Sequence, residues 1–420
     1  METKVNLNAK RTAIKVSLVA AISLLLLIPL AMIKGVIEDR EQTKDSVTME
    51  VANSYAKPQT VSAPYLESYV VETRTVDKEI EPSGKQTYVE DYDSYCSQVD
   101  YTADVETDIL HRSIYDVIVY NSKVHISGKL PITEKSVVAR DNEFRFKVTD
   151  IKGFSNPSQL TFGGQSFELR RQSEEFVANV VFPKGAKVGD IIDFAFTFDL
   201  KGTESLFFNP SSDGNTTVAI SSSYPHPSFQ GAMLPNTREI KDDGFNATWS
   251  VSSFNSSSYD DMGVKFVDPA NPYQQSMRSA KYGMLIIILV FVAGLFVEFL
   301  TRKDINPIQY AVIGLSLVLF YSLLVAFSEF MTFGAAYIVA ALMTTGALMF
   351  YFRAILRSRS AYILGGFVAV VYALNYMLLQ METYALLAGS VVLFLLLCVV
   401  MHLTADINKQ IKLNNHETTD

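Results

Sequence analysis

The sequence predicts a helical membrane protein with a large, mostly β, sandwich-like domain between its first membrane helix and a C-terminal helical bundle. Two observations point to this class. Hydrophobic residues make up 49% of the 420-residue chain and charged residues only 19%. The apolar residues gather in one block near the N-terminus and a long block after residue 281, and a polar stretch of ordinary soluble character separates them.

The first predicted membrane helix covers residues 16–33, VSLVAAISLLLLIPLAMI. A helix that crosses a bilayer needs about 20 mostly apolar residues. Basic residues precede this run, and no A-x-A-like cleavage site follows it, which favours an uncleaved anchor over a signal peptide. Residues 38–55 contain few helix breakers, so we expect the helix to continue beyond the membrane.

The C-terminal block divides into five further apolar runs, which predict five more membrane helices. The runs cover residues 282–300, 308–327, 333–352, 361–379 and 384–403. Basic residues in short loops mark the cytoplasmic side of a membrane protein. Such residues occur in the N-terminus, the loops at 301–307 and 353–360 and the tail, whereas the loops near Glu329 and Glu382 have none. This alternation predicts six helices, both termini in the cytoplasm and one external domain.

These runs divide the chain into four predicted parts. They are a cytoplasmic N-terminus with the first membrane helix (1–36), an exported domain (37–279), a five-helix bundle (280–405) and a cytoplasmic tail (406–420). The exported part contains 23 Lys or Arg and 36 Asp or Glu, a net charge of −13. Nucleic-acid binding needs a basic surface, so this class of partner is not expected.

The exported part is predicted to be a β domain of short antiparallel strands. Several of its segments alternate polar with aromatic or β-branched residues, and turn residues separate them. This pattern is typical of a sandwich or a barrel. The predicted strands are residues 114–120, 124–130, 143–149, 166–171, 176–182, 191–199 and 245–251.

No catalytic, cofactor or metal site is predicted. The five histidines show no HExxH motif and no paired Cys/His spacing, and the chain has no GxSxG elbow, P-loop or dinucleotide-binding glycine motif. An acidic run at 91–108 lacks the calcium-loop pattern and is interpreted as a solvent-facing surface. The chain is therefore not expected to be an enzyme.

The predicted helices have almost no charge midway through the membrane, which counts against a proton-coupled pump. Glu298 lies near the end of its helix, four residues before Arg302, and we expect a local ion pair there. Glu329 and Glu382 lie at the external ends of helices, so we expect both side chains to contact water.

The stretch YPHPSFQGAMLP, residues 224–235, is the most unusual part of the exported domain. Its prolines fix φ and remove backbone donors, so the segment is stiff and is not a central strand. His226 has no carboxylate or second histidine nearby in sequence, which favours a structural or binding role over catalysis. We also expect this stretch to pack with residues 266–283, which lead to the next helix.

Long stretches of the chain resemble the inner-membrane protein CreD family, also called the colicin-tolerance family. The resemblance rests on YPHPSFQGAMLPNTREIKDDGFNATWSV, VKFVDPANPYQQSMRSAKYGMLIIILVF, IPLAMIKGVIEDRE, INPIQYAVIGLSLVLFYSLLVAFSEF and YFRAILRSRS. It implies a Gram-negative inner-membrane protein with a periplasmic domain, associated with envelope integrity and with a stress response to cell-wall-targeting antibiotics. It implies no catalytic residues.

The leading hypothesis is a non-enzymatic envelope protein whose β domain binds an envelope protein or a cell-wall or lipid component, while its helices contact the lipid bilayer. The alternative is a membrane carrier of a lipid-like or amphipathic molecule, and an extracytoplasmic enzyme comes third. The candidate binding or structural residues are Pro225, His226, Pro227, Ser228, Phe229, Gly231, Arg238, Asp268, Tyr273 and Arg278.

Overall fold

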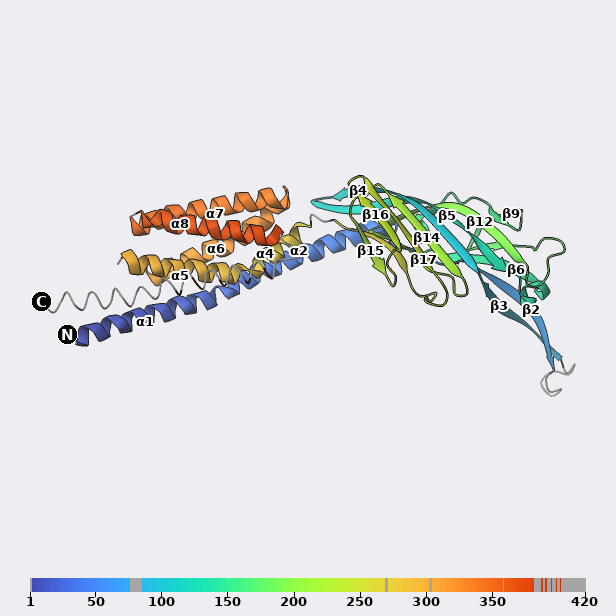
Figure 1. Cartoon of the computed structure of the whole chain (residues 1–420), viewed down its shortest axis with the longest axis horizontal. Helices are drawn as coiled ribbons and strands as arrows, with labels where there is room; N and C mark the ends of the chain where they lie inside the picture. Colours follow the sequence, from blue (N-terminus) through green and yellow to red (C-terminus); the bar gives the residue numbers. More distant parts are fainter. Residues whose placement is uncertain are drawn as a thin grey trace. The chain divides into compact units, whose positions relative to one another are not determined.

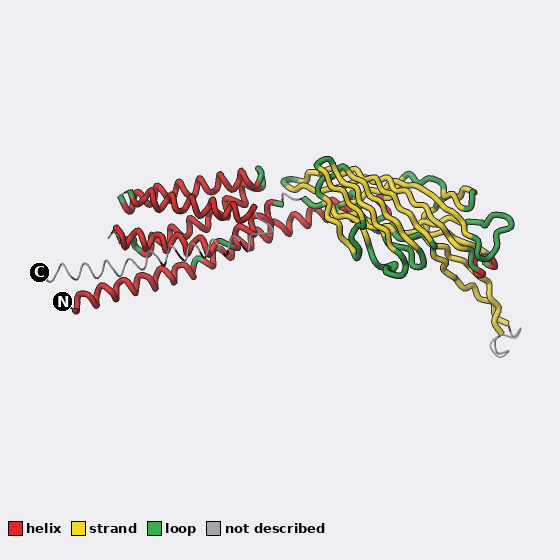
Figure 2. The backbone as a smooth tube through the Cα atoms, viewed as in Figure 1, coloured by secondary structure: helices red, strands yellow, loops and turns green. Residues whose placement is uncertain are grey.

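The computed structural model of the chain describes residues 2–75, 85–268, 271–301, 304–357 and 359–380, and five single positions beyond them. The chain forms two compact units. The helical unit consists of Met1–Thr43 and Ala270–Asp420, and the β unit consists of Lys44–Pro269. Figure 1 follows the chain through both units, and Figure 2 shows that one is built of helices and the other mainly of strands.

The N-terminal helix is long, as predicted. Helix α1 (Glu2–Leu25) and helix α2 (Leu27–Ser54) are separated only at Leu26. Residues Ile14–Ser54 together form a helix that is long and apolar enough to cross a membrane. Pro29 lies in the first turn of α2, where a missing N–H removes little hydrogen bonding. The predicted extension through residues 38–55 is confirmed to Ser54.

Three C-terminal helices are also long and apolar enough to cross a membrane: α6 (Pro307–Ser328), α7 (Phe333–Leu356) and α8 (Ser360–Gln380). Helix α4 (Pro272–Lys281) and helix α5 (Gly283–Thr301) meet this test only as a pair, and a bend of 43° separates them. The last predicted helix, 384–403, lies almost entirely outside the described residues. The described residues therefore support a helical membrane unit without establishing five C-terminal spans.

Local sequence explains where these helices begin and end. At the start of α6, the side chain of Asn306 accepts a hydrogen bond from Ile308 N–H, and the backbone N–H of Asn306 donates to the side chain of Gln309. Pro307 follows at the first helical position, which it favours because its φ is already helical. Arg357 caps the C-terminal end of α7 with a left-handed φ of 44°.

The β unit contains three sheets. The nine-stranded sheet contains β16 (Thr237–Lys241), β17 (Gly244–Val251), β14 (Asn215–Ser222), β4 (Gln98–Arg112), β5 (Tyr115–Pro131), β12 (Ile191–Thr203), β8 (Leu160–Phe162) and β9 (Gln165–Phe167) in that order, with β7 (Phe154–Ser155) paired to β12. The five-stranded sheet contains β10 (Arg170–Gln172), β11 (Glu175–Asn179), β6 (Asp141–Lys147), β2 (Tyr65–Thr75) and β3 (Lys85–Tyr95). The four-stranded sheet contains β1 (Gln59–Val61), β13 (Ser205–Phe208), β18 (Met262–Phe266) and β15 (Pro227–Gly231).

The two smaller sheets pack against the nine-stranded sheet and share one hydrophobic core with it. Phe144 of the five-stranded sheet lies 5.0 Å from Phe194 of the large sheet, measured between ring centroids. Phe208 of the four-stranded sheet lies 4.8 Å from Tyr101. The inward-facing residues alternate with outward-facing ones along β4 and β12, as a two-layered arrangement requires. A short helix, α3 (Glu134–Val138), and a 3₁₀ turn, Ile151–Gly153, connect strands.

The observed strands correct several sequence expectations. The predicted strands 114–120 and 124–130 are one continuous strand, β5, because the polar residues between them alternate in phase with the buried ones. The predicted strand 166–171 is divided between β9 and β10. Most strands pair antiparallel, but β1 pairs parallel with β13 and β4 parallel with β14.

Candidate functional site

The last five residues of the stretch PHPSFQG form strand β15 (Pro227–Gly231) at the edge of the four-stranded sheet. Within that sheet β15 pairs with β18, and Pro227 lies opposite Phe266. Proline is tolerated at the first residue of a strand and on an edge, where no ladder hydrogen bond is lost. The prediction that this stretch is not a central strand is therefore confirmed.

The residues before β15 attach it to the end of β18. The Tyr224 hydroxyl donates to the Val267 carbonyl at 2.8 Å, and the His226 carbonyl accepts from Val267 N–H at 3.3 Å. Burial, followed by the nearby Asp268 carboxylate, raises the pKa of Tyr224, so this hydroxyl remains a donor at neutral pH. The expected contact of PHPSFQG with the residues after β18 is thus present at Val267.

The inner side of β15 is fixed by packing and by one glycine. The ring of Phe229 lies 5.6 Å from Phe245 and 5.7 Å from Trp249, both on β17. Gly231 ends the strand with a φ of 107°, and a Cβ there would lie 2.3 Å from the Asp261 carbonyl oxygen. Only glycine fits this conformation without displacing the backbone.

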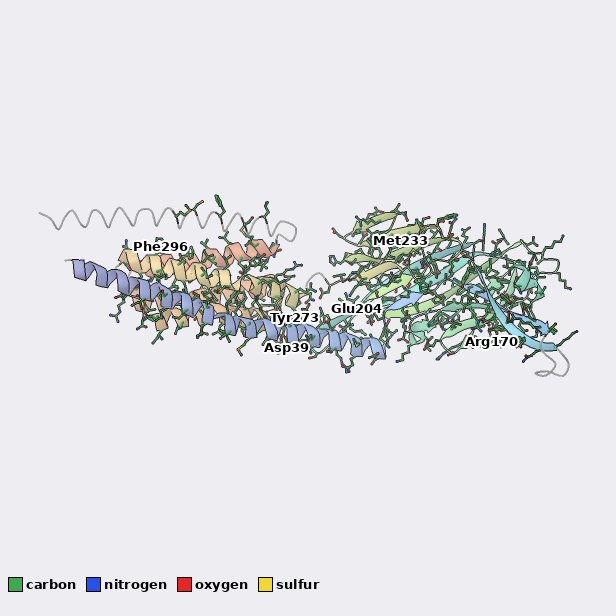
Figure 3. All side chains as sticks on the ribbon, turned by 90° about the horizontal axis from the view of Figure 1, so that it is seen from below. Asp39, Arg170, Glu204, Met233, Tyr273 and Phe296 are labelled. Carbon is green, nitrogen blue, oxygen red and sulfur yellow. The ribbon has the colours of Figure 1, made fainter. Side chains whose placement is uncertain are left out.

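The other candidate residues lie apart from β15. Asp268 accepts a hydrogen bond from Lys44 Nζ at 3.2 Å, inside the β unit. Arg238 is exposed on β16, an edge strand of the nine-stranded sheet. Tyr273 and Arg278 belong to the helical unit, where Tyr273, labelled in Figure 3, is buried on α4 and Arg278 is exposed. The structure therefore joins His226 to Val267, the residue before Asp268, and places Arg238, Tyr273 and Arg278 on other elements.

The described surroundings of His226 show few features of a catalytic site. Its side chain is exposed, and its ring lies edge-on to Tyr224, 5.9 Å away. No carboxylate among the described residues forms an ion pair with it. Over the same residues, no group of three or more His, Cys, Asp or Glu side chains is arranged to hold a metal ion. The acidic run on β3 and β4 faces outward at most positions, as expected.

A hollow of about 300 Å³ lies in the β unit between the end of α2 and the end of β4. Glu50 and Arg112 form an ion pair at this hollow, which Tyr55 and His111 also line. His111 Nδ1 lies 2.6 Å from Asp116 Oδ1, and both side chains are more than half exposed. Sequence reasoning missed this hollow because its two walls are about 60 residues apart.

The helical unit contains an ion pair that sequence spacing does not predict. Glu298 of α5 pairs with Lys15 of α1, and its other oxygen accepts a hydrogen bond from the Tyr310 hydroxyl of α6 at 3.2 Å. The Lys15 and Glu298 side chains are 20% and 12% exposed. Arg302, the expected partner, lies outside the described residues. We call Lys15, Glu298 and Tyr310 the first polar clamp, since they connect three helices.

A second polar clamp lies at the other end of the helical unit. Glu329, directly after α6, lies 3.5 Å from Arg40 of α2 and accepts a hydrogen bond from the Tyr273 hydroxyl at 3.4 Å. The expectation of a hydrated Glu329 is wrong, because its side chain is only 10% exposed. Tyr310 of α6 and Glu329, the C-terminal cap of this helix, are 19 residues apart. At 1.5 Å per residue the two clamps are about 28 Å apart, close to the thickness of a bilayer's hydrocarbon core.

The comparison with known proteins settles the family. The model of the family described as "Inner membrane protein CreD" matches residues 11–410. The chain belongs to the CreD family. The inner membrane protein CreD of Escherichia coli (strain K12) is 30% identical over 439 aligned positions, which cover 94% of this chain and 95% of the relative. The resemblance read from the sequence is therefore confirmed.

Solved structures add no functional information about this member of the CreD family. An M1 zinc metallopeptidase from Deinococcus radiodurans is similar with a TM-score of 0.24 and 9% identity, over 41% of this chain and 42% of that one. A putative nutrient binding protein from Legionella pneumophila gives a TM-score of 0.30 and 8% identity, over 60% and 89%. Similarities this weak do not indicate a shared function.

Proposed function

We propose that the chain is a multi-pass inner-membrane protein that supports cell-envelope integrity under stress, and that its β unit acts by binding rather than by catalysis. The expected partner is an envelope protein or a component of the cell wall or membrane. Membership of the CreD family supports the inner-membrane part of this proposal. The observation that carries the binding part is the position of PHPSFQG on an edge strand.

The proposed topology has six membrane helices, both termini in the cytoplasm and the β unit in the periplasm. The proposed limits are 1–36, 37–279, 280–405 and 406–420. The alternation of basic and base-free loops supports this orientation. The two polar clamps support the membrane-spanning part of this topology, because buried charges of a membrane protein are best tolerated near the water interfaces.

Edge strands bind partners through their free backbone groups. An extended segment of a partner can pair with such a strand, and side chains on alternate positions then give specificity. On β15 the backbone edge away from β18 is available among the described residues, and Gln230 is exposed beside it. The inward anchoring of Phe229 keeps this edge in one position.

Site-specific photo-crosslinking in living cells tests this proposal. A photoreactive amino acid replaces Gln230 on β15 or, as a matched control, Gln172, which is exposed on the edge strand β10 of a different sheet. We expect a discrete crosslinked species from Gln230 that Gln172 does not give. Identical species from both positions, or none from Gln230 in cells under envelope stress, would contradict binding through β15.

The second candidate function is a membrane carrier of a lipid-like or amphipathic molecule. Buried polar side chains inside the helical unit, among them Ser276, Ser279 and Asn375, favour it, because a bundle that only anchors the chain needs no such groups in its interior.

A further inference from the structure

Helix α4 is a polar helix with a buried face. Its buried residues are Tyr273, Ser276, Ser279 and Ala280, and it packs against α6 and α8. Tyr282 caps α4 at the 43° bend, after which the strongly apolar α5 begins. Broken helices of this kind place polar groups inside membrane bundles, and in transporters they commonly form binding sites.

Ser279 connects α4 to a hydrogen-bonded group on two other helices. Asn375 Nδ2 of α8 donates to Ser279 Oγ at 3.1 Å and to the Tyr337 hydroxyl of α7 at 3.0 Å. The Tyr337 hydroxyl in turn donates to the Tyr372 carbonyl at 2.8 Å. The ring of Phe320 lies between 4.3 and 5.2 Å from the rings of Tyr321, Tyr337 and Tyr372, so aromatic side chains surround this group.

Four polar atoms beside this group have no hydrogen-bond partner among the described residues. They are Ser276 Oγ, Tyr321 Oη, Tyr372 Oη and Asn375 Oδ1. Their side chains belong to residues that are between 1% and 3% exposed. We call these four residues the polar cluster. Unpaired polar atoms are costly inside a protein and more so in a membrane, where no bulk water replaces the missing partner.

The chemistry of these atoms restricts the missing partner. Three hydroxyls can donate and accept, whereas the Asn375 carbonyl oxygen can only accept. A hydroxyl group on the partner suits these atoms, since it can donate one hydrogen bond, to an acceptor such as the Asn375 carbonyl oxygen, and accept two from hydroxyl donors. The four side chains are neutral, and Glu329, eight residues after Tyr321 on α6, is already paired with Arg40. A charged partner would therefore lack a counter-charge within the cluster.

We propose that the polar cluster is a binding site for a neutral hydroxyl-bearing group. Eight helical residues separate Tyr321 from Glu329, which places the site about 12 Å from the second polar clamp along the helix axis. The headgroup of an uncharged amphipathic lipid alcohol reaches this depth while its chain stays among apolar side chains, and water supplies the same chemistry. Binding of a lipid at this site would support the second candidate function, the membrane carrier, and it does not depend on binding through β15.

Thermal unfolding of the purified full-length protein in detergent tests the site. The variants Tyr321→Phe and Tyr372→Phe each remove one hydroxyl and keep the ring, and Tyr362→Phe, on the exposed side of α8, is the matched control. The probes are 1-oleoylglycerol, an uncharged lipid with a hydroxyl headgroup, and methyl oleate, which has the same chain and no hydroxyl.

We expect 1-oleoylglycerol, but not methyl oleate, to raise the Tm of the wild type and of Tyr362→Phe, with a smaller rise for the two cluster variants. A variant that loses one hydrogen bond is expected to have a Tm about 2–4 °C lower than the wild type. If neither lipid acts but both cluster variants lose this much Tm, the site holds water, which also supports the proposal. If neither lipid acts and both cluster variants are as stable as the wild type or more stable, the site is dry and the proposal is wrong. Failure here leaves the crosslinking test of β15 unaffected.

Discussion

Replacing Lys15 with methionine would test how the N-terminal helix is attached to the rest of the helical unit. The change leaves Glu298 charged, 12% exposed and without its cation, although the hydrogen bond from Tyr310 remains. Removing one partner of a buried ion pair typically costs about 3–5 kcal/mol. Because the Tyr310 bond stays in place, we expect the free energy of unfolding to fall by about 2–4 kcal/mol.

The complementary change, Glu298→Gln, should cost less. Lys15 then keeps Asp304, whose carboxylate lies 3.4 Å away and is almost fully exposed. A lysine side chain is also long enough to carry its charge to water. We expect a loss of about 1 kcal/mol, and we expect the double variant to recover most of the loss of Lys15→Met, because neutral pairs replace buried ion pairs at little cost.

The assay is reversible unfolding in mixed detergent micelles, followed by circular dichroism, with Lys281→Met as the control. Lys281 is exposed on α4, so its replacement should change stability by no more than about 0.5 kcal/mol. Equal losses for the two single variants, with additive behaviour in the double variant, would refute the first polar clamp. Orientation should not change, because other basic residues remain before the first membrane helix.

Three further predictions concern the β unit. Asp93 faces outward, but partial desolvation of its carboxylate, with a smaller contribution from Asp91, raises its pKa, so its charged form is disfavoured in the fold. Asp93→Asn should therefore slightly raise the free energy of unfolding at neutral pH, and urea titrations should show the gain disappearing below the unfolded pKa of about 3.9. Gly231→Ala should cost about 1–3 kcal/mol from strain alone and more from its backbone clash, whereas Gly189→Ala, with a φ of 91° and open space, should show only the strain; equal losses in thermal melts would contradict the clash. Cys96 is buried and burial raises its pKa, so a thiol reagent should label it only after denaturation, and rapid native labelling would show that the core opens.

Hydropathy and strand alternation predicted those helices and strands whose formation depends mainly on residues close together in the sequence. The apolar runs gave α6, α7 and α8 within a few residues, and period-two alternation gave β12 and β17. The break expected between residues 120 and 124 was wrong, because Asn121, Ser122 and Lys123 have turn-forming side chains but follow the alternation of β5. A continuous ladder with β4 and β12 outweighs these local preferences.

The polar contacts of the helical unit could not be predicted from spacing. Lys15 and Glu298 are 283 residues apart, and the local rule of i+4 favoured Arg302 instead. Asn375 was visible as a polar residue in an apolar run, but its partners lie on α4 and α7. One signal was available: the two serines of α4, Ser276 and Ser279, are three residues apart, a spacing that places them on one helix face.

The claim on which the account depends is that residues 44–269 are outside the cytoplasm and the end of the chain is inside. Alkaline phosphatase, which is active only after export, can be fused after Asp268 and, in the full chain, after Asp420. The account predicts high phosphatase activity for the first fusion and none for the second, with green fluorescent protein giving the opposite pattern. An active phosphatase at Asp420, or an inactive one at Asp268 with the fusion protein present in the membrane, would contradict the proposed topology and the envelope role of the β unit.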